Sequence, residues 1–157
     1  MKLICSLIIA VYIGGFLSPL QAQTTSLKLA DGYYLTANDG IKVYDKNQKV
    51  FFYLDKTSLI PIRHVKSTEV NRVDNLAKVR YELSSSLDAF GTSALANFSP
   101  NFDRTTNIAL VINGEPLFVA GLLNKITSGR MSFSSGKLTK TEVEKMKSEI
   151  DKAIAKK

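Results

Sequence analysis

The segment Asn107-Ile-Ala-Leu-Val-Ile-Asn-Gly-Glu-Pro-Leu-Phe-Val-Ala120 decides the fold of this chain. Residues 107–112 are a nearly continuous apolar run, which predicts a central strand that is covered on both faces of a sheet. Asn113-Gly114 follows, and both residues accept the positive φ of a two-residue hairpin turn. Residues 115–120 are then the return strand, so the segment predicts a buried β-hairpin.

The sequence after the hairpin predicts one short strand and one helix. The strand covers residues 130–134, between glycine turns at Gly129 and Gly136. Thr139 and Glu142 form a capping box, in which the hydroxyl and the carboxylate bind free backbone N–H groups at the helix start. The helix carries one apolar stripe on a charged surface, so we expect it to pack on a sheet and not to span a membrane. The stripe comprises Val143, Met146, Ile150, Ala153 and Ile154.

The sequence before the hairpin predicts two strands and another helix. The strands are expected at 64–73 and 76–83, joined by a polar turn. Only one of the two alternating sets of side chains in the second run is consistently apolar, which indicates that one sheet face is buried. The serine run 84–86 offers hydroxyl groups for the N-cap of a helix over 87–98.

Short strands with aromatic and β-branched residues dominate the N-terminal half. Residues 32–36 and 41–44 flank Asn38-Asp39-Gly40, which has turn chemistry. A second polar turn at 45–48 precedes an apolar strand at 50–54, so these segments predict a meander of three strands. The whole chain is therefore expected to have an α+β fold, in which a small mixed or antiparallel sheet is packed by two helices and preceded by a short β-meander.

The N-terminus has the pattern of an export signal. Met1-Lys2 is a minimal positive region, and residues 3–20 are almost wholly apolar. Pro19 then breaks the helix, and Ala22 is a small residue at which signal peptidase can cut. We expect cleavage after Ala22 and a periplasmic or secreted protein. The alternative is an uncleaved anchor, because about 18 residues is near the lower limit for a bilayer span.

These patterns divide the chain into four parts. Residues 1–22 are the signal peptide, 23–30 a polar leader, 31–75 a β-rich N-terminal part and 76–157 an α+β part. The roughly 135 residues after the signal suit one domain with one core.

Composition excludes several classes of protein. Cys5 is the only cysteine and lies in the signal, so the rest of the chain has neither a disulfide framework nor a thiolate site. The net charge of +7 becomes +6 without Lys2. A basic exported domain could make weak contact with an anionic membrane surface or cell-wall polymer, or simply carry a lysine-rich soluble surface. Export argues against nucleic-acid binding.

No catalytic constellation emerges from the sequence, so we expect neither an enzyme nor a cofactor. His64 is the only histidine, which argues against a histidine-rich metal site, and a structural role is expected for it. The serine run lacks a Gly-x-Ser-x-Gly elbow. The early aspartates lie in turns, without the ligand spacing of a calcium loop. The residues singled out are structural turns and caps, namely Gly114, Gly129, Gly136, Thr139 and Glu142.

From Leu76 onward the sequence resembles the head part of the first large periplasmic domain of SecD and SecDF, the accessory membrane proteins of the Sec translocon. The resemblance is carried by the segment 107–120, by Ile126-Thr-Ser-Gly129 and by Gly136-Lys-Leu-Thr139 before the final helix. The predicted strand and helix at 79–98 precede the same hairpin in that family. The resemblance implies small α+β layers and a tendency to contact unfolded or extended polypeptide.

Three features depart from the family pattern. Gly121 stands where the family usually has a proline, and one extra residue lies between Phe133 and Gly136, which we expect to form a bulge or a longer turn. SecD proteins also have transmembrane helices that couple a proton gradient to export. After residue 22 this sequence has no apolar segment of spanning length, so proton-driven transport is not carried over to it.

Two functions follow as expectations. The first is an exported, non-enzymatic binding or accessory module of the cell envelope, whose exposed strand edge accepts an extended segment of a protein partner through main-chain hydrogen bonds. The alternative is a structural assembly component of an envelope protein complex, with a surface patch that binds one folded partner. Residues 31–54 are either a meander that caps the head-like part or the edge that binds the partner.

Overall fold

The computed structural model describes residues 28–75, 78–98, 106–122 and 125–156. The predicted signal and most of the predicted leader lie outside these residues. In the part of the chain that the structure describes, no helix has the length and hydrophobicity needed to cross a membrane.

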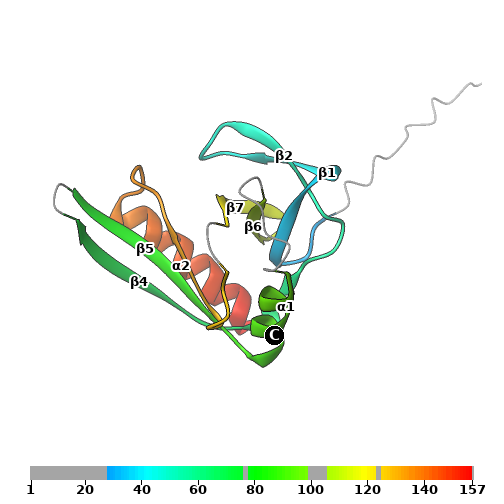
Figure 1. Cartoon of the computed structure of the whole chain (residues 1–157). Helices are drawn as coiled ribbons and strands as arrows, with labels where there is room; N and C mark the ends of the chain where they lie inside the picture. The colour runs from blue at the N-terminus through cyan, green and yellow to red at the C-terminus, as the bar shows by residue number, and fades with distance from the viewer. Residues whose placement is uncertain (1–27, 76–77, 99–105, 123–124, 157) are drawn as a thin grey trace, which may run out of the picture.

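The described residues form two antiparallel sheets and two α-helices, which confirms the α+β prediction (Figure 1). One sheet has the strand order β2-β1-β6-β7, with β3 also paired to β1, and the other has the order β4-β5-β8. In chain order the elements are β1 (Gly32–Asp45), β2 (Val50–Leu54), β3 (Ile60–Pro61), the 3-10 helix η1 (Ile62–His64), β4 (Val65–Asn75), β5 (Lys78–Leu87), α1 (Ala89–Phe98), β6 (Asn107–Ile112), β7 (Glu115–Gly121), β8 (Arg130–Ser134) and α2 (Lys140–Ala155).

The hairpin β6–β7 forms as its sequence predicts. β6 pairs with β1 on one side and β7 on the other, and both of its faces are buried. Leu110 belongs to the core cluster that lies between the sheets and α2, whereas Val111 belongs to a second cluster on the opposite face. Asn113 and Gly114 have φ values of 55° and 84°, so both take the left-handed conformation that the turn requires.

Helix α2 begins at the predicted capping box. The Thr139 hydroxyl accepts a hydrogen bond from the Glu142 N–H, and the Glu142 carboxylate accepts one from the Thr139 N–H. Hydrogen bonds from the Thr139 N–H and hydroxyl lower the pKa of Glu142, because they stabilise its ionised form. The helix packs along the β4–β5 sheet (Figure 1), which buries four members of the predicted stripe and leaves Ile154 half-buried.

The expected capping role of the serine run 84–86 is wrong. The serines lie in β5, where Ser84 and Ser85 are buried between the pairing strands β4 and β8. Asp88 caps α1 instead, and its Oδ1 accepts a hydrogen bond of 2.9 Å from the Gly91 N–H. Strand pairing on both sides therefore extends β5 past the point at which local chemistry predicts a helix start.

The expected turn at residues 38–40 is also wrong. Residues 32–45 form one strand, with a large irregularity where Thr36 and Ile41 both lie opposite Leu54 of β2. Gly40 faces the backbone of Leu54 so closely that an added Cβ would overlap the Leu54 carbonyl. The glycine thus permits close approach of two backbones inside a strand, and β1–β2 is a two-stranded hairpin in place of the predicted three strands.

The other predicted strands form, but their pairing depends on tertiary structure. β4 and β5 form an antiparallel hairpin from the two predicted runs, and β8 covers residues 130–134 as predicted. The expected turn at Asp74-Asn75 is wrong, because both residues lie in β4 and pair with β5. β8 pairs with β5 and not with the preceding strand β7. The first sheet combines strands from residues 31–75 with strands from residues 76–157, and so does the second.

Candidate functional site

Strand β2 is a terminal strand of its sheet and has a free edge. Among the described residues it pairs only with β1, from Val50 to Leu54. Alternate residues of a strand direct their N–H and C=O groups to the same side, so the outer edge of β2 presents unpaired backbone groups. The five-residue strand contains no proline or charged residue that would block another strand from pairing there.

An exposed aromatic face lies on the β1–β2 hairpin beside this edge. Tyr44, Phe51 and Tyr53 are 42%, 60% and 42% exposed, although each is a large apolar side chain. The rings of Tyr44 and Phe51 are 5.0 Å apart, and Lys42 Nζ lies 4.4 Å from the Phe51 ring centre. We call Lys42, Tyr44, Phe51 and Tyr53 the hairpin aromatic face. The opposite face of the hairpin is core, because Val43 and Leu54 are buried there.

The turn of this hairpin is anchored on β7. The side-chain amides of Asn47 and Gln48 donate hydrogen bonds of 3.0 and 2.8 Å to the carbonyls of Leu117 and Val119. These carbonyls belong to alternate residues of β7, so they point to the same side, away from β6. Asp45 Oδ1 holds the turn by accepting hydrogen bonds from the N–H groups of Asn47 and Gln48. The turn therefore covers the outer edge of β7, whereas no other described strand pairs with the outer edge of β2.

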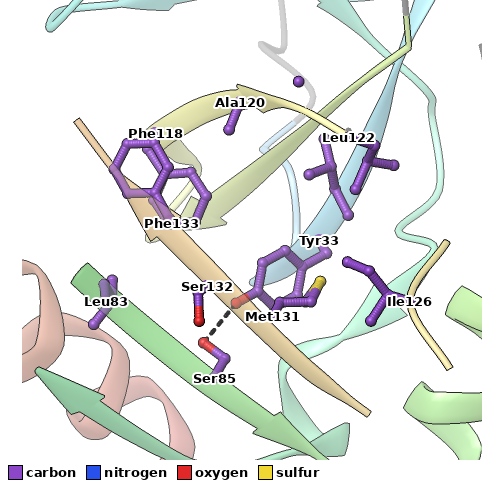
Figure 2. Close-up of a pocket in the computed structure, with 12 residues that line it drawn as sticks. Tyr33, Leu83, Ser85, Phe118, Ala120, Leu122, Ile126, Met131, Ser132 and Phe133 are labelled. Carbon is purple, nitrogen blue, oxygen red and sulfur yellow. Dashed lines mark hydrogen bonds between the residues drawn. The ribbon is translucent and has the colours of Figure 1, made fainter. Parts of the chain in front are cut away.

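A pocket of about 240 Å³ lies between the two sheets (Figure 2). One wall comes from β1, β6 and β7, and the other from β5 and β8. The rings of Phe118 and Phe133 stack on each other at one side of the pocket, with centres 4.1 Å apart and planes within 7°. The pocket is lined by Tyr33, Leu83, Ser85, Ile108, Phe118, Ala120, Gly121, Leu122, Ile126, Met131, Ser132 and Phe133.

Tyr33 and Ser85 join the two sheets beside this pocket. The Tyr33 hydroxyl donates a hydrogen bond of 2.8 Å to Ser85 Oγ, as the dashed line in Figure 2 shows. Burial raises the pKa of Tyr33 to about 12, and the hydrogen bond with Ser85 opposes this shift. The phenol is therefore neutral at physiological pH, and its hydroxyl group already donates its hydrogen bond to Ser85.

His64 lies in a structural contact, as expected for a lone histidine. Its Nδ1 is 2.9 Å from Asp88 Oδ2, and its ring stacks on Phe90 with a centre-to-centre distance of 4.1 Å. Hydrogen bonds from the Gly91 N–H and from His64 lower the pKa of Asp88. The pair thus holds η1 against the start of α1. Among the described residues, no group of three His, Cys, Asp or Glu side chains could hold a metal ion.

The structure does not bring the five turn and cap residues together in one site. Gly114 lies in the β6–β7 turn, and Thr139 and Glu142 start α2. Gly129 precedes β8 with a φ of 69°, and its carbonyl accepts a hydrogen bond from the Leu87 N–H. Gly136 lies in the turn between β8 and α2. The hairpin aromatic face was not singled out from sequence, and its only sequence signal is the spacing of Phe51 and Tyr53 by two residues in a strand.

Comparison with known proteins supports the fold alone. No protein-family model and no curated protein matches the sequence. Among solved structures, the chain is similar to a crystal structure of SecDF in its super-membrane-facing form, with a TM-score of 0.54 and 11% sequence identity. The similarity covers 82% of this chain but only 19% of the SecDF chain. The fold therefore resembles part of SecDF.

Proposed function

We propose that this protein is an exported, non-enzymatic accessory module of the cell envelope that contacts extended or unfolded polypeptide. The free edge of β2, next to the hairpin aromatic face, is the observation that carries this proposal. A client segment would add as a further strand beside β2. Its backbone would pair with the free N–H and C=O groups, without dependence on the client's sequence.

The hairpin aromatic face suits the side chains of such a segment. A strand beside β2 would place alternate side chains next to Phe51 and Tyr53, which lie on the same face. Aromatic rings contact many kinds of apolar side chain, and Lys42 adds a positive charge at the border of the face. This combination favours a broad range of extended clients over one fixed sequence.

The similarity of the fold to part of SecDF supports an accessory role in protein export. The similarity covers only 19% of the SecDF chain. We therefore propose contact with polypeptide for this protein, and we do not propose the activity of the whole of SecDF. The exported location rests on the N-terminal sequence pattern, Met1 to Ala22.

Site-specific crosslinking in cells tests the proposal. A photo-crosslinking amino acid at Phe51 is expected to capture many envelope and secretory proteins, seen as a smear of products. The matched control is Val79, which is 49% exposed on β5 of the other sheet and is expected to give few products. A single dominant product at Phe51 would instead support the alternative function, a structural assembly component with one folded partner. Equal yields at the two positions would contradict both functions.

Measurements with purified components then test the mode of binding. With a reduced, unfolded secretory protein, backbone amides of β2 are expected to become protected from hydrogen exchange. Tyr53→Ser should weaken binding at least about five-fold, because it removes aromatic contact next to the edge. Val79→Ser removes a side chain of similar exposure on the other sheet and should leave affinity unchanged. Absence of a complex at micromolar concentrations would refute the proposal.

A further inference from the structure

The pocket between the sheets is a second feature, separate from the β2 edge. β2 is at one end of its sheet, whereas the pocket lies beneath β7 at the other end. Gly121 and Ser132 line the pocket and are exposed to solvent, so the pocket reaches the surface. Its deeper walls include the buried side chains of Leu83, Met131 and Ile108.

The pocket offers no charge and few free polar groups. None of its described lining residues is acidic, basic or histidine. The Tyr33 hydroxyl is bonded to Ser85, and Ser132 Oγ lies 2.8 Å from Ser84 Oγ. A charged ligand group would lose its hydration in this pocket without gaining a partner, which is costly.

The size of the pocket limits what can enter. A volume of about 240 Å³ is below the usual range of drug-sized pockets, which starts at about 300 Å³. It exceeds the roughly 150 Å³ of an apolar cavity that binds benzene. One substituted ring or one short branched chain therefore fits.

We propose that this pocket binds a small, uncharged apolar molecule of about the size of a single substituted ring. The proposal is independent of the proposed function. A free small molecule is favoured over the side chain of a strand added to β7, because the Asn47 and Gln48 amides occupy the carbonyls of Leu117 and Val119 on that edge. The stacked rings of Phe118 and Phe133 offer an aromatic wall for the ligand (Figure 2).

Titration of the purified protein with toluene, followed by methyl NMR, tests this inference. Toluene is expected to give saturable shifts of the Met131, Ala120 and Leu122 methyl signals, with nuclear Overhauser contacts from toluene to the Met131 methyl. Benzoate has the same ring with a charged carboxylate, and it should bind at least about ten-fold more weakly. Equal binding of benzoate, or no saturable shift with toluene, would overturn the proposal.

One substitution in the pocket and one control outside it locate the binding. Ala120→Leu fills the pocket from β7 and should abolish the toluene shifts. Val79→Ser changes an exposed side chain of β5 that does not line the pocket, and it should leave affinity within about two-fold. Unchanged affinity in folded Ala120→Leu would place the ligand elsewhere. If that variant does not fold, the contacts to Met131 in the unaltered protein decide the question.

Contacts from toluene confined to the hairpin aromatic face would also refute the pocket proposal. A second titration uses a peptide with alternating apolar side chains in place of toluene. If it shifts the Met131 methyl while toluene does not, the pocket takes client side chains and the small-molecule proposal is wrong. Failure of β2-edge binding would leave these outcomes untouched, since the pocket and the hairpin aromatic face share no residue.

Discussion

The two hairpins of the first sheet have opposite environments. β6 is buried along almost its whole length, whereas four of the five β2 residues are exposed or half-exposed. Both hairpins belong to the same sheet and are joined by β1, whose first half pairs with β6 and whose second half pairs with β2. The β6–β7 hairpin therefore buries apolar side chains on both faces of β6, whereas the β1–β2 hairpin leaves large apolar side chains of β2 exposed.

This difference has a simple physical origin. Burial of apolar surface stabilises the folded state by roughly 25 cal/mol per Å², so β6 contributes with both faces and β2 with only one. Large aromatic side chains that remain exposed on β2 contribute little to folding, yet they are available for contact with another molecule. The following substitutions test how sharply the two roles are separated.

The largest effect is expected from removing a β6 side chain. Leu110 is fully buried, so Leu110→Ala should lower the free energy of unfolding by about 2–5 kcal/mol, as measured by urea denaturation. Phe51→Ala in β2 should cost less than about 1 kcal/mol, because its side chain is 60% exposed and packs on Tyr44 and Lys42 at the surface. Similar losses in the two variants would show that β2 is as important for stability as β6.

A pH-dependent effect is expected from Tyr33 in the buried half of β1. Its pKa is about 12 in the folded protein and 10.0 when unperturbed, so between these values the folded state binds the proton more tightly than the unfolded state. Stability from Tyr33 is complete below pH 10 and falls by up to about 1.4 kcal/mol per pH unit towards pH 12. Burial also raises the pKa of Tyr34, which adds to the loss.

Urea unfolding from pH 9 to pH 12 measures this contribution. Tyr33→Phe should flatten the decline above pH 10, at a cost of about 1 kcal/mol at neutral pH because Ser85 loses its donor. Tyr44→Phe, in the exposed half of β1, should keep the decline of the unaltered protein. Parallel pH curves for the two variants would rule out Tyr33 as the source.

The two turns are expected to differ in the same direction as the two hairpins, and the smallest effect of all is expected in the β1–β2 turn. Gly114→Val should cost more than about 1 kcal/mol, because a β-branched residue is strained at a φ of 84°. Its Cβ would also meet Lys28 Cγ at 2.9 Å. Lys49 has a φ of 58° in the other turn, so Lys49→Gly should stabilise by about 0.5 kcal/mol at most. The melting temperatures of the two variants test these predictions. An unchanged melting temperature for Gly114→Val would contradict the argument that valine is strained at this position.

The sequence correctly predicted the features that depend only on residues close together in the chain. The capping box of α2, its apolar stripe and the Asn113-Gly114 turn all form where the sequence places them. The wrong predictions, the cap at 84–86 and the turns at 38–40 and 74–75, share one cause. Residues 84–86 and 74–75 pair with neighbouring strands, and Thr36 and Ile41, which flank 38–40, both pair with Leu54 of β2. This pairing overrides the local preference of serine, aspartate, asparagine or glycine.

The candidate sites were less predictable than the fold. The sequence suggested that residues 31–54 could form a binding edge, but alternation alone does not reveal which face of the hairpin lacks a partner. The pocket had no sequence signal, since its walls come from five strands in two sheets and from Leu122 and Ile126. Its lining residues, such as Leu83 and Phe118, are of types that are common in any core. Only the packing of the two sheets shows that a space remains between them.

The sequence by itself determined the α+β class, the central buried strand, the type of its turn and the start of the last helix. These depend on apolar periodicity, on residues that accept positive φ and on capping groups, all of which act within a few residues. Only the tertiary structure decided how the strands divide into two sheets, that β8 pairs with β5, and that β2 lies at the end of its sheet. Pairing between distant strands is set by the total burial and backbone hydrogen bonding of the whole chain, which no short segment specifies.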